Sequence, residues 1–315
     1  MTKIALLSPY YGSLPDCFPF YVKSLANNPN IHVYMFTDCS YEGDVPENLH
    51  FIKSNIQHFK RLVKDKLDVD AIINKGYKLC DFRPAFGVIF EDYIIGYDYW
   101  AMGDIDVIYG QLLDNFPENW RSFDVVSMVP EWLSGSLCIF RNVENINKLY
   151  MSSSSWETVF SSEKHYAFDE CNCLYERLRQ GENILEIDEL QSFTYLVKNA
   201  AKNGDLKVWF KRQLVKEKIF ANNDHIQMLD GRLYRKDRQE LTYYHLVSEK
   251  RHDRFVLPKW NHIPNEYFIV PHGFFSSDDF WHSQLTFYRL YVLLRSFILD
   301  TKQLLKRVRR KLRIL

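Results

Sequence analysis

Asp104 and Asp106 are the residues whose types and spacing best suit chemistry. They stand one residue apart in YDYWAMGDIDVIYG, residues 97–110, among apolar and aromatic residues. Side chains two residues apart on a strand face the same side, so both carboxylates would point one way. Carboxylates are ligands that Mg²⁺ and Mn²⁺ prefer, and these ions complete their shell with water and substrate phosphate oxygens. The pair therefore predicts a metal and diphosphate site, and the alternative is two capping or solvated acids.

Several motifs of common enzyme classes are absent from the sequence. There is no Walker-type phosphate loop, no GxGxxG after the first strand, no HExxH and no GxSxG. Simple NTPases, dinucleotide-dependent dehydrogenases, zinc proteases and serine hydrolases are therefore not favoured. The CNC at 171–173 has no second matching pair, which argues against a zinc site.

Alternating strand and helix patterns surround the acid pair. We expect strands within residues 3–12, 31–38, 97–110 and 123–130, and helices within 18–30, 59–69 and 83–94. Short strands or hairpins are expected between 185 and 245. Such alternation predicts an α/β fold with a mostly parallel central sheet flanked by helices.

Charge is unevenly distributed along this chain of 315 residues. Lys and Arg number 40, as do Asp and Glu, yet residues 302–315 hold seven Lys or Arg and no acid. The remaining body therefore carries a net charge of −7, which argues against a general nucleic-acid binder.

Residues 285–315 have helical periodicity, with Leu305, Val308, Leu312 and Leu315 among basic residues. This pattern predicts a basic amphipathic helical tail on the anionic inner face of the cytoplasmic membrane. The alternatives are a solvated terminal helix and a disordered basic end. The apolar run at the N-terminus is too short for a signal peptide, and no run approaches a membrane span, so we expect a cytoplasmic, peripheral protein.

Three motifs in order carry a family resemblance. KLCDFRPAFG, GDIDVIYG and GSLCIFRN follow an N-terminal strand unit, and together they resemble bacterial glycosyltransferase-like proteins of capsule and O-antigen polysaccharide biosynthesis. Those proteins are similar to the GT-A superfamily, in which a DxD motif binds metal and the nucleotide-sugar diphosphate. The resemblance implies a GT-A-like, Rossmann-like catalytic domain at 1–250, with a nucleotide-binding half at about 1–110 and an acceptor half at about 111–250. An irregular connecting segment at 251–284 and the tail would follow.

The resemblance also implies a set of donor-binding residues. The first-strand loop would hold the nucleoside, Asp38 the base or ribose, and the KLCDFR segment would lie beside the nucleotide. A strand and loop near 135 would lie beneath the donor sugar, and a late basic residue would meet the diphosphate. The implied set is Pro9, Tyr10, Tyr11, Gly12, Asp38, Lys78, Asp81, Arg83, Asp104, Gly135, Ser136, Lys250 and Arg251. A turn or cap is the alternative for Asp38, and structural pairing is the alternative for Arg83.

Metal and catalytic residues are implied in the same way. His245 would join Asp104 and Asp106 in binding Mn²⁺ or Mg²⁺, with Asp106 holding the ion most directly. Asp169 or Glu170 would be the general base, the alternative being that both belong to a helix N-terminus. The HxxGxxKPW pattern of one retaining family is not matched, and the Asp-Glu pair favours inversion.

The function implied is a metal-dependent glycosyltransferase. It would move a sugar, galactopyranosyl or galactofuranosyl, from a UDP-sugar to a saccharide acceptor on a lipid carrier. Two alternatives stay open. One is a nucleotidyl- or phosphotransferase that uses the same metal site. The other is a non-catalytic, saccharide-binding scaffold of a membrane-associated assembly.

Overall fold

The computed structural model describes residues 2–211, 215–216, 224–247, 255–271, 273–279 and 301. The chain divides into two compact units, one of Met1–Val107 with Leu112–Gln213 and the other of Ile108–Gln111 with Leu214–Leu315. Lys250, Arg251 and, apart from residue 301, the predicted tail lie outside the described residues. In the part of the chain that is described, no helix combines the length and apolar character needed to cross a membrane.

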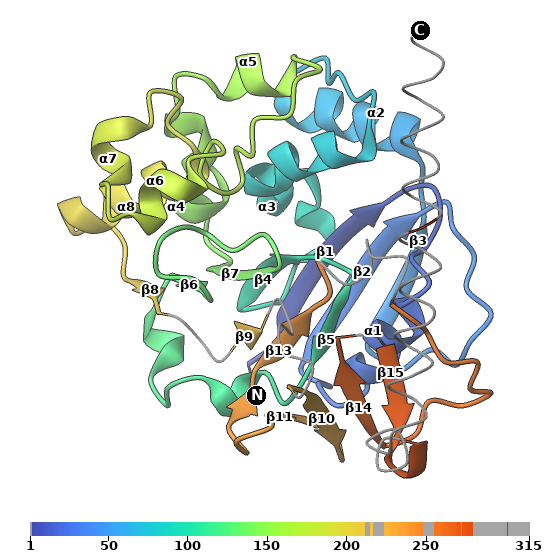
Figure 1. The fold of residues 1–315 in the computed structure, drawn as a ribbon. Helices are drawn as coiled ribbons and strands as arrows, with labels where there is room; N and C mark the ends of the chain where they lie inside the picture. The colour runs from blue at the N-terminus through green and yellow to red at the C-terminus, as the bar shows by residue number, and fades with distance from the viewer. Residues whose placement is uncertain are drawn as a thin grey trace, which may run out of the picture. The chain divides into compact units, whose positions relative to one another are not determined.

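The first unit is built on a large sheet with strand order β3-β2-β1-β4-β7-β6-β8 (Figure 1). Strand β7 runs antiparallel to β4 and β6, and the other neighbouring pairs are parallel. The predicted mostly parallel sheet is therefore confirmed. The strands are β1 Ile4–Tyr10, β2 Ile31–Thr37, β3 Leu49–Lys53, β4 Tyr99–Gly103, β6 Val125–Ser127, β7 Leu137–Arg141 and β8 Val208–Phe210.

Helices cover both faces of this sheet. On one face, Leu7 and Phe36 share a continuous core with Phe59 of α2. Phe51 of β3 pairs with Met35, the residue before Phe36, so the Phe51 side chain lies on the other face of the sheet from Phe36. There its ring lies 6.4 Å from that of Phe18 in α1. Burial on both faces explains the nearly continuous apolar runs of β1 and β4.

The α-helices of the first unit are mostly short. They are α1 Phe18–Leu25, α2 Ile56–Leu67, α3 Phe86–Ile89, α4 Glu144–Asn147, α5 Trp156–Phe160, α6 Tyr175–Arg179, α7 Ile184–Ile187 and α8 Phe193–Asn203. The 3₁₀ segments are η1 Gly76–Ala85, η2 Glu91–Tyr93, η3 Leu113–Asn115, η4 Trp120–Ser122 and η5 Leu149–Ser152. A single helix over 83–94 was expected, but η1, α3 and η2 take its place. Gly87 lies in the middle of this stretch and lowers its helix propensity.

The second unit contains two small sheets in its described part. One is antiparallel, with order β12-β11-β10-β14-β15, and the other has order β5-β13-β9. Their strands are β5 Val107–Tyr109, β9 Val215–Lys216, β10 Ile226–Leu229, β11 Arg232–Arg235, β12 Glu240–Leu241, β13 Tyr243–His245, β14 Glu266–Val270 and β15 Gly273–Ser276. β14 and β15 lie in the 251–284 segment that was expected to be irregular. The predicted division into donor and acceptor halves stays a prediction.

Candidate functional site

One edge of the large sheet gathers most of the sequence-predicted site segments. The parallel strands β1, β2 and β4 end there, and the reversed strand β7 begins there, since Leu137 pairs with Gly103. Strand order reverses between β1 and β4, because β1 is followed by β2 on one side while β4 lies on the other. Open α/β sheets bind ligands outside the strand ends at such a point. The loops after β1, β2 and β4 and the loop before β7 therefore share the favoured position.

Asp104 and Asp106 lie in a bend rather than on one strand. β4 ends at Gly103 and β5 begins at Val107, so the expectation of two acids on a single strand face is wrong. The bend is held by the neighbouring loop, because the Asp104 N–H donates to the Ser136 carbonyl at 3.2 Å.

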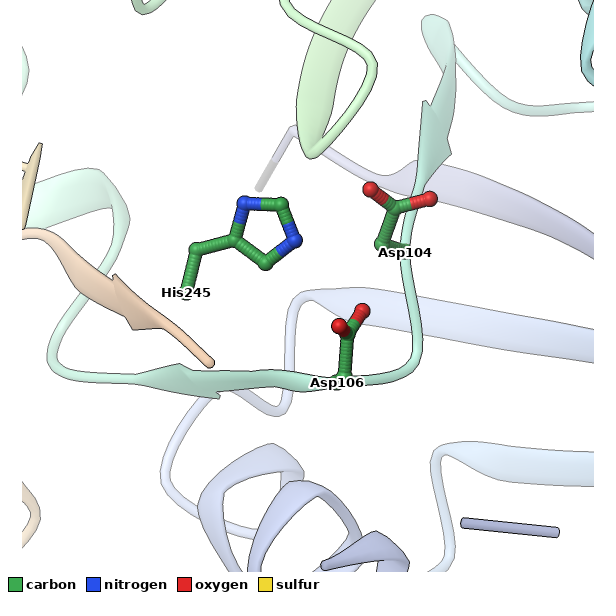
Figure 2. Close-up of side chains that lie close together, drawn as sticks. All are labelled: Asp104, Asp106 and His245. Atoms are coloured by element: carbon green, nitrogen blue, oxygen red, sulfur yellow. The ribbon is translucent and has the colours of Figure 1, made fainter. Parts of the chain in front are cut away.

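The bend nevertheless directs both carboxylates toward His245, the last residue of β13 (Figure 2). One ligand atom from each of Asp104, Asp106 and His245 lies within 4.8 Å of the others. Ligands on one ion at about 2.1 Å lie no more than roughly 4.2 Å apart, so small side-chain movements would complete a metal site. The three residues form a candidate metal-binding group.

The chemistry of this group suits a divalent cation. Asp106 and His245 are buried, whereas the Asp104 side chain is 27% exposed. Carboxylates suit Mg²⁺ and Mn²⁺, while an imidazole suits transition metals better than Mg²⁺. The mixed set therefore fits Mn²⁺ more closely than Mg²⁺, which prefers oxygen ligands alone.

Arg83 of η1 connects the Asp104 bend to two other segments. Its Nη2 donates to Asp104 Oδ1 at 2.5 Å, and its Nη1 donates to Asp169 Oδ2 at 3.1 Å and to the Gly135 carbonyl at 3.0 Å. Although burial opposes its charge, the nearby carboxylates of Asp104 and Asp169 raise the pKa of Arg83 well above its usual value. The guanidinium thus stays charged and holds three segments of the site together.

Asp169 and Glu170 lie in a turn before α6, not at a helix N-terminus. Glu170 accepts hydrogen bonds from the Gly135 N–H at 2.8 Å and from the Tyr175 hydroxyl at 2.5 Å. Burial raises the pKa of Glu170, although those two donors lower it. Burial also raises the pKa of Asp169 well above its usual value, although Arg83 pulls it down and Glu170 adds to the rise. Both carboxylates therefore hold a proton more readily than an exposed carboxylate does.

Gly135 is required by this arrangement. A Cβ at this position would lie 2.9 Å from Arg83 Nη1 and 3.0 Å from Glu170 Oε1. Any side chain would therefore push apart the two groups that meet there. The adjacent Ser136 is buried, and its hydroxyl lies 2.8 Å from that of Ser134.

The loop after β1 is held by the end of β2. Gly12 has φ of +109°, which L side chains rarely adopt, and its N–H donates to Asp38 Oδ1 at 2.9 Å. This bond supports the turn reading of Asp38. Tyr11 lies 3.2 Å from the Ser54 hydroxyl, and burial raises its pKa to about 12. Tyr10 donates to the Ser13 carbonyl at 2.8 Å, and Pro9 stays within β1.

Lys78 and Asp81 do not offer their charges at this edge. Their side chains are 1% and 0% exposed, and they pair with each other at 2.9 Å. The expected place beside the nucleotide is therefore corrected, because each charge is already satisfied inside the fold. We call Asp104, Asp169 and Glu170 the acid-rich group. Of Lys78, Asp81 and Arg83, it is Arg83 that contacts this group.

Sequence reasoning missed two residues that hold this group. Tyr175 donates to Glu170, and the hydroxyl and N–H of Thr194 both donate to the Glu170 carbonyl. Neither residue belongs to a recognisable motif. Thr194 lies 24 residues from its partner, so no local pattern indicates the contact.

The fold and the site define an α/β protein with a candidate metal-binding group beside the edge of a mostly parallel sheet. Residues 6–278 match a family model described as "Family of unknown function (DUF6625)", and the chain belongs to this family. None of the curated proteins compared with the sequence matches it.

Proposed function

We propose that this protein is a metal-dependent glycosyltransferase of GT-A-like fold that moves a sugar from a UDP-sugar to a saccharide acceptor. The observation that carries the proposal is the grouping of Asp104, Asp106 and His245, with the two acids directly after β4. A divalent cation bound there would neutralise charge on a departing diphosphate. The switch point of the sheet is where nucleotides bind in doubly wound folds, which supports a nucleotide donor.

Local charge supports a cation at this place. Arg83 is one positive group among the three carboxylates of Asp104, Asp169 and Glu170, all of which affect it or one another electrostatically. Neighbouring carboxylates disfavour one another's charged forms, and a cation relieves that effect. The surplus of acids over Arg83 therefore favours binding of Mn²⁺ or Mg²⁺.

Of the two acids first considered as general base, we favour Asp169. Both carboxylate oxygens of Glu170 accept hydrogen bonds, one from the Gly135 N–H and one from the Tyr175 hydroxyl, so Glu170 acts mainly in shaping the site. Asp169 is held through Oδ2 by Arg83, and burial raises its pKa well above the usual value, which makes it a stronger proton acceptor than an exposed carboxylate. The proposal retains inversion and a galactosyl donor as its first choices.

We also retain a lipid-linked acceptor as part of the proposal. Residues 302–315 hold seven Lys or Arg and no acid, a composition that favours anionic lipid surfaces. Co-sedimentation of the full chain with phosphatidylglycerol vesicles, and not with neutral vesicles, would support this part. Equal sedimentation with both vesicle types, or with neither, would contradict it.

A donor screen tests the central claim. The full chain is incubated with UDP-galactose, UDP-glucose and GDP-mannose, with Mn²⁺ or with excess chelator, and release of UDP or GDP is measured. We expect UDP release that requires Mn²⁺ and is lost in the folded Asp106→Asn variant.

Full release in chelator would overturn the metal role. A sugar 1-phosphate in place of UDP, left when the uridylyl group is transferred, would instead identify a nucleotidyltransferase. Absence of any Mn²⁺-dependent UDP binding by calorimetry would favour the non-catalytic scaffold.

A further inference from the structure

A buried ion pair lies on η1 just before Arg83. Lys78 and Asp81 are three residues apart, a spacing that places both side chains on one face of a 3₁₀ helix. The Lys78 ammonium donates to Asp81 Oδ2 at 2.9 Å and to the carbonyls of Val159 at 2.6 Å and Lys164 at 2.7 Å. Its three N–H donors are therefore all used.

Asp81 in turn holds the backbone of the following segment. The Phe168 N–H donates to Asp81 Oδ1 at 2.9 Å, and the Tyr166 N–H donates to Oδ2 at 3.0 Å. His165 Nδ1 lies 3.3 Å from Oδ1. Burial alone would raise the pKa of Asp81, but the contacts with His165, Phe168 and Lys78 hold it below its usual value. A charged carboxylate at 81 thus ties down residues 165–168, which we call the clamped loop.

The clamped loop has a backbone conformation that needs such support. Ala167 has φ of 51°, in the left-handed region, between the two residues whose N–H groups Asp81 accepts. A residue other than glycine persists in this region only where its surroundings over-determine it. The Ala167 carbonyl then accepts the Glu170 N–H at 3.1 Å, and the Phe168 carbonyl accepts the Phe193 N–H at 2.8 Å.

The clamped loop leads directly into the acid-rich group. Asp169 follows Phe168 in the chain, and its carboxylate meets Arg83 of the same η1 segment that carries Asp81. The η1 segment therefore makes two contacts with this part of the chain. Asp81 accepts hydrogen bonds from the clamped loop, and Arg83 donates to the carboxylate of Asp169, which follows the loop. Buried ion pairs are weak stabilisers compared with apolar pairs of similar size, so stability alone does not account for this pair.

We propose that Asp81 is a positioning residue: it fixes the clamped loop so that Asp169 meets Arg83 and Arg83 stays directed at Asp104. The proposal rests on the proposed function, because the geometry it protects is that of the metal and donor site. Lys78 is the counter-ion of Asp81, and it also contacts the start of this segment through the Lys164 carbonyl and the Tyr166 ring. Asp81 itself touches no substrate.

Two variants separate positioning from simple loss of a buried ion pair. Asp81→Asn removes the negative charge and replaces one acceptor oxygen with an amide N–H₂ that faces N–H donors, so it breaks the pair and weakens the hold on the loop. Lys78→Met breaks the same pair but leaves Asp81 to accept the Tyr166 and Phe168 N–H groups. Asp124→Asn is the matched control, because Asp124 also accepts from an arginine and a backbone N–H, those of Arg141 and Lys207.

Two measurements are made on the full chain. Hydrogen exchange of a peptide covering residues 160–174 reports the loop, and calorimetry reports UDP binding in the presence of Mn²⁺. For Asp81→Asn we expect exchange about tenfold faster or more, as when buried N–H groups lose their acceptor. We also expect UDP affinity weaker by roughly 10- to 100-fold, the range found when residues behind metal ligands are changed. Asp124→Asn should keep both values within about threefold, and Lys78→Met should change both less than Asp81→Asn does, although both variants lower stability.

Unchanged exchange in Asp81→Asn, or faster exchange with unchanged UDP affinity, would overturn the positioning role. Equal losses in Asp124→Asn would do the same. A wild-type chain that binds no UDP would instead count against the proposed function, and the exchange rates would still decide whether Asp81 holds the loop. If Asp81→Asn does not fold, exchange of the wild type decides, because rapid exchange at Tyr166 and Phe168 would contradict the clamp.

Discussion

The candidate site contains two pairs of acids, Asp169 with Glu170 and Asp104 with Asp106, and the groups that surround the two pairs differ. Asp169 is buried and Glu170 is half-buried, and both accept hydrogen bonds from N–H and O–H donors that the fold itself supplies. Asp104 and Asp106 turn toward an imidazole that offers a third ligand atom, and Asp104 is partly exposed. Donors of the fold hold the first group, whereas the second group brings together three ligand atoms of the kinds that a divalent cation binds. The comparison shows why identical residue types in one site need not share a role.

The largest expected effect comes from breaking the second group. Asp106→Asn should weaken Mn²⁺ binding by more than the roughly 100-fold that changes behind the ligands reach. Asp104→Asn should cause a smaller loss, because Asp104 is more exposed and already shares its carboxylate with Arg83. Calorimetric titration of each variant with Mn²⁺ measures its loss of affinity, and circular dichroism shows whether the variant folds. Equal or reversed losses would show that the two acids are wrongly ranked.

Removal of Arg83 should damage both groups at once. Arg83→Gln leaves Asp169 buried without its positive partner, a change that typically destabilises by about 3 kcal/mol. Arg141→Gln is the control, since its pair with Asp124 is more exposed and should matter less. Urea unfolding of both variants measures the difference. Similar losses of unfolding free energy in the two variants would mean that the burial of Arg83 and Asp169 does not strengthen the effect of removing the arginine.

Gly135→Ala tests whether the site requires Arg83 and Glu170 to lie so close to the backbone at position 135. The new Cβ would crowd Arg83 and Glu170, so we expect destabilisation of about 1–3 kcal/mol, as for other overpacked sites. Gly76→Ala provides a matched control, because nothing lies within 4 Å of its added Cβ. Thermal unfolding should show a lower midpoint for the first variant and an equal or higher one for the second. An unchanged midpoint for Gly135→Ala would show that the site accommodates a side chain.

The smallest effect concerns the charge of Glu170. Its pKa is raised in the folded protein, mainly by burial, so the folded state binds its proton more tightly than the unfolded state. The resulting stability is present below the unfolded pKa of about 4.5 and is lost as pH rises through the higher folded value. Glu170→Gln imitates the protonated form. It should flatten the decline of the unfolding midpoint above pH 4.5, and a parallel decline in both proteins would contradict the raised pKa.

The sequence allowed the sheet and the acid pair to be predicted, because both depend on local patterns. The apolar runs of β1 and β4 and the DxD spacing are visible within ten residues. The bend at Asp104 was not predictable, since the residues on both sides of it are equally strand-like. The contact of Arg83 with Asp169 joins positions 86 residues apart. Periodicity carries no information on such pairs, so their geometry required the structure.

The reversed direction of β7 has a consequence for how this family could diversify. Because β7 starts where β1, β2 and β4 end, the segments at this edge are separate connections on one shared scaffold. Residues 10–13 lie on one such connection, which the end of β2 holds through Asp38, so their sequence could change while the strands beneath them stay the same. Under the proposed function, such changes would alter selectivity for the sugar without redesign of the hydrophobic interior.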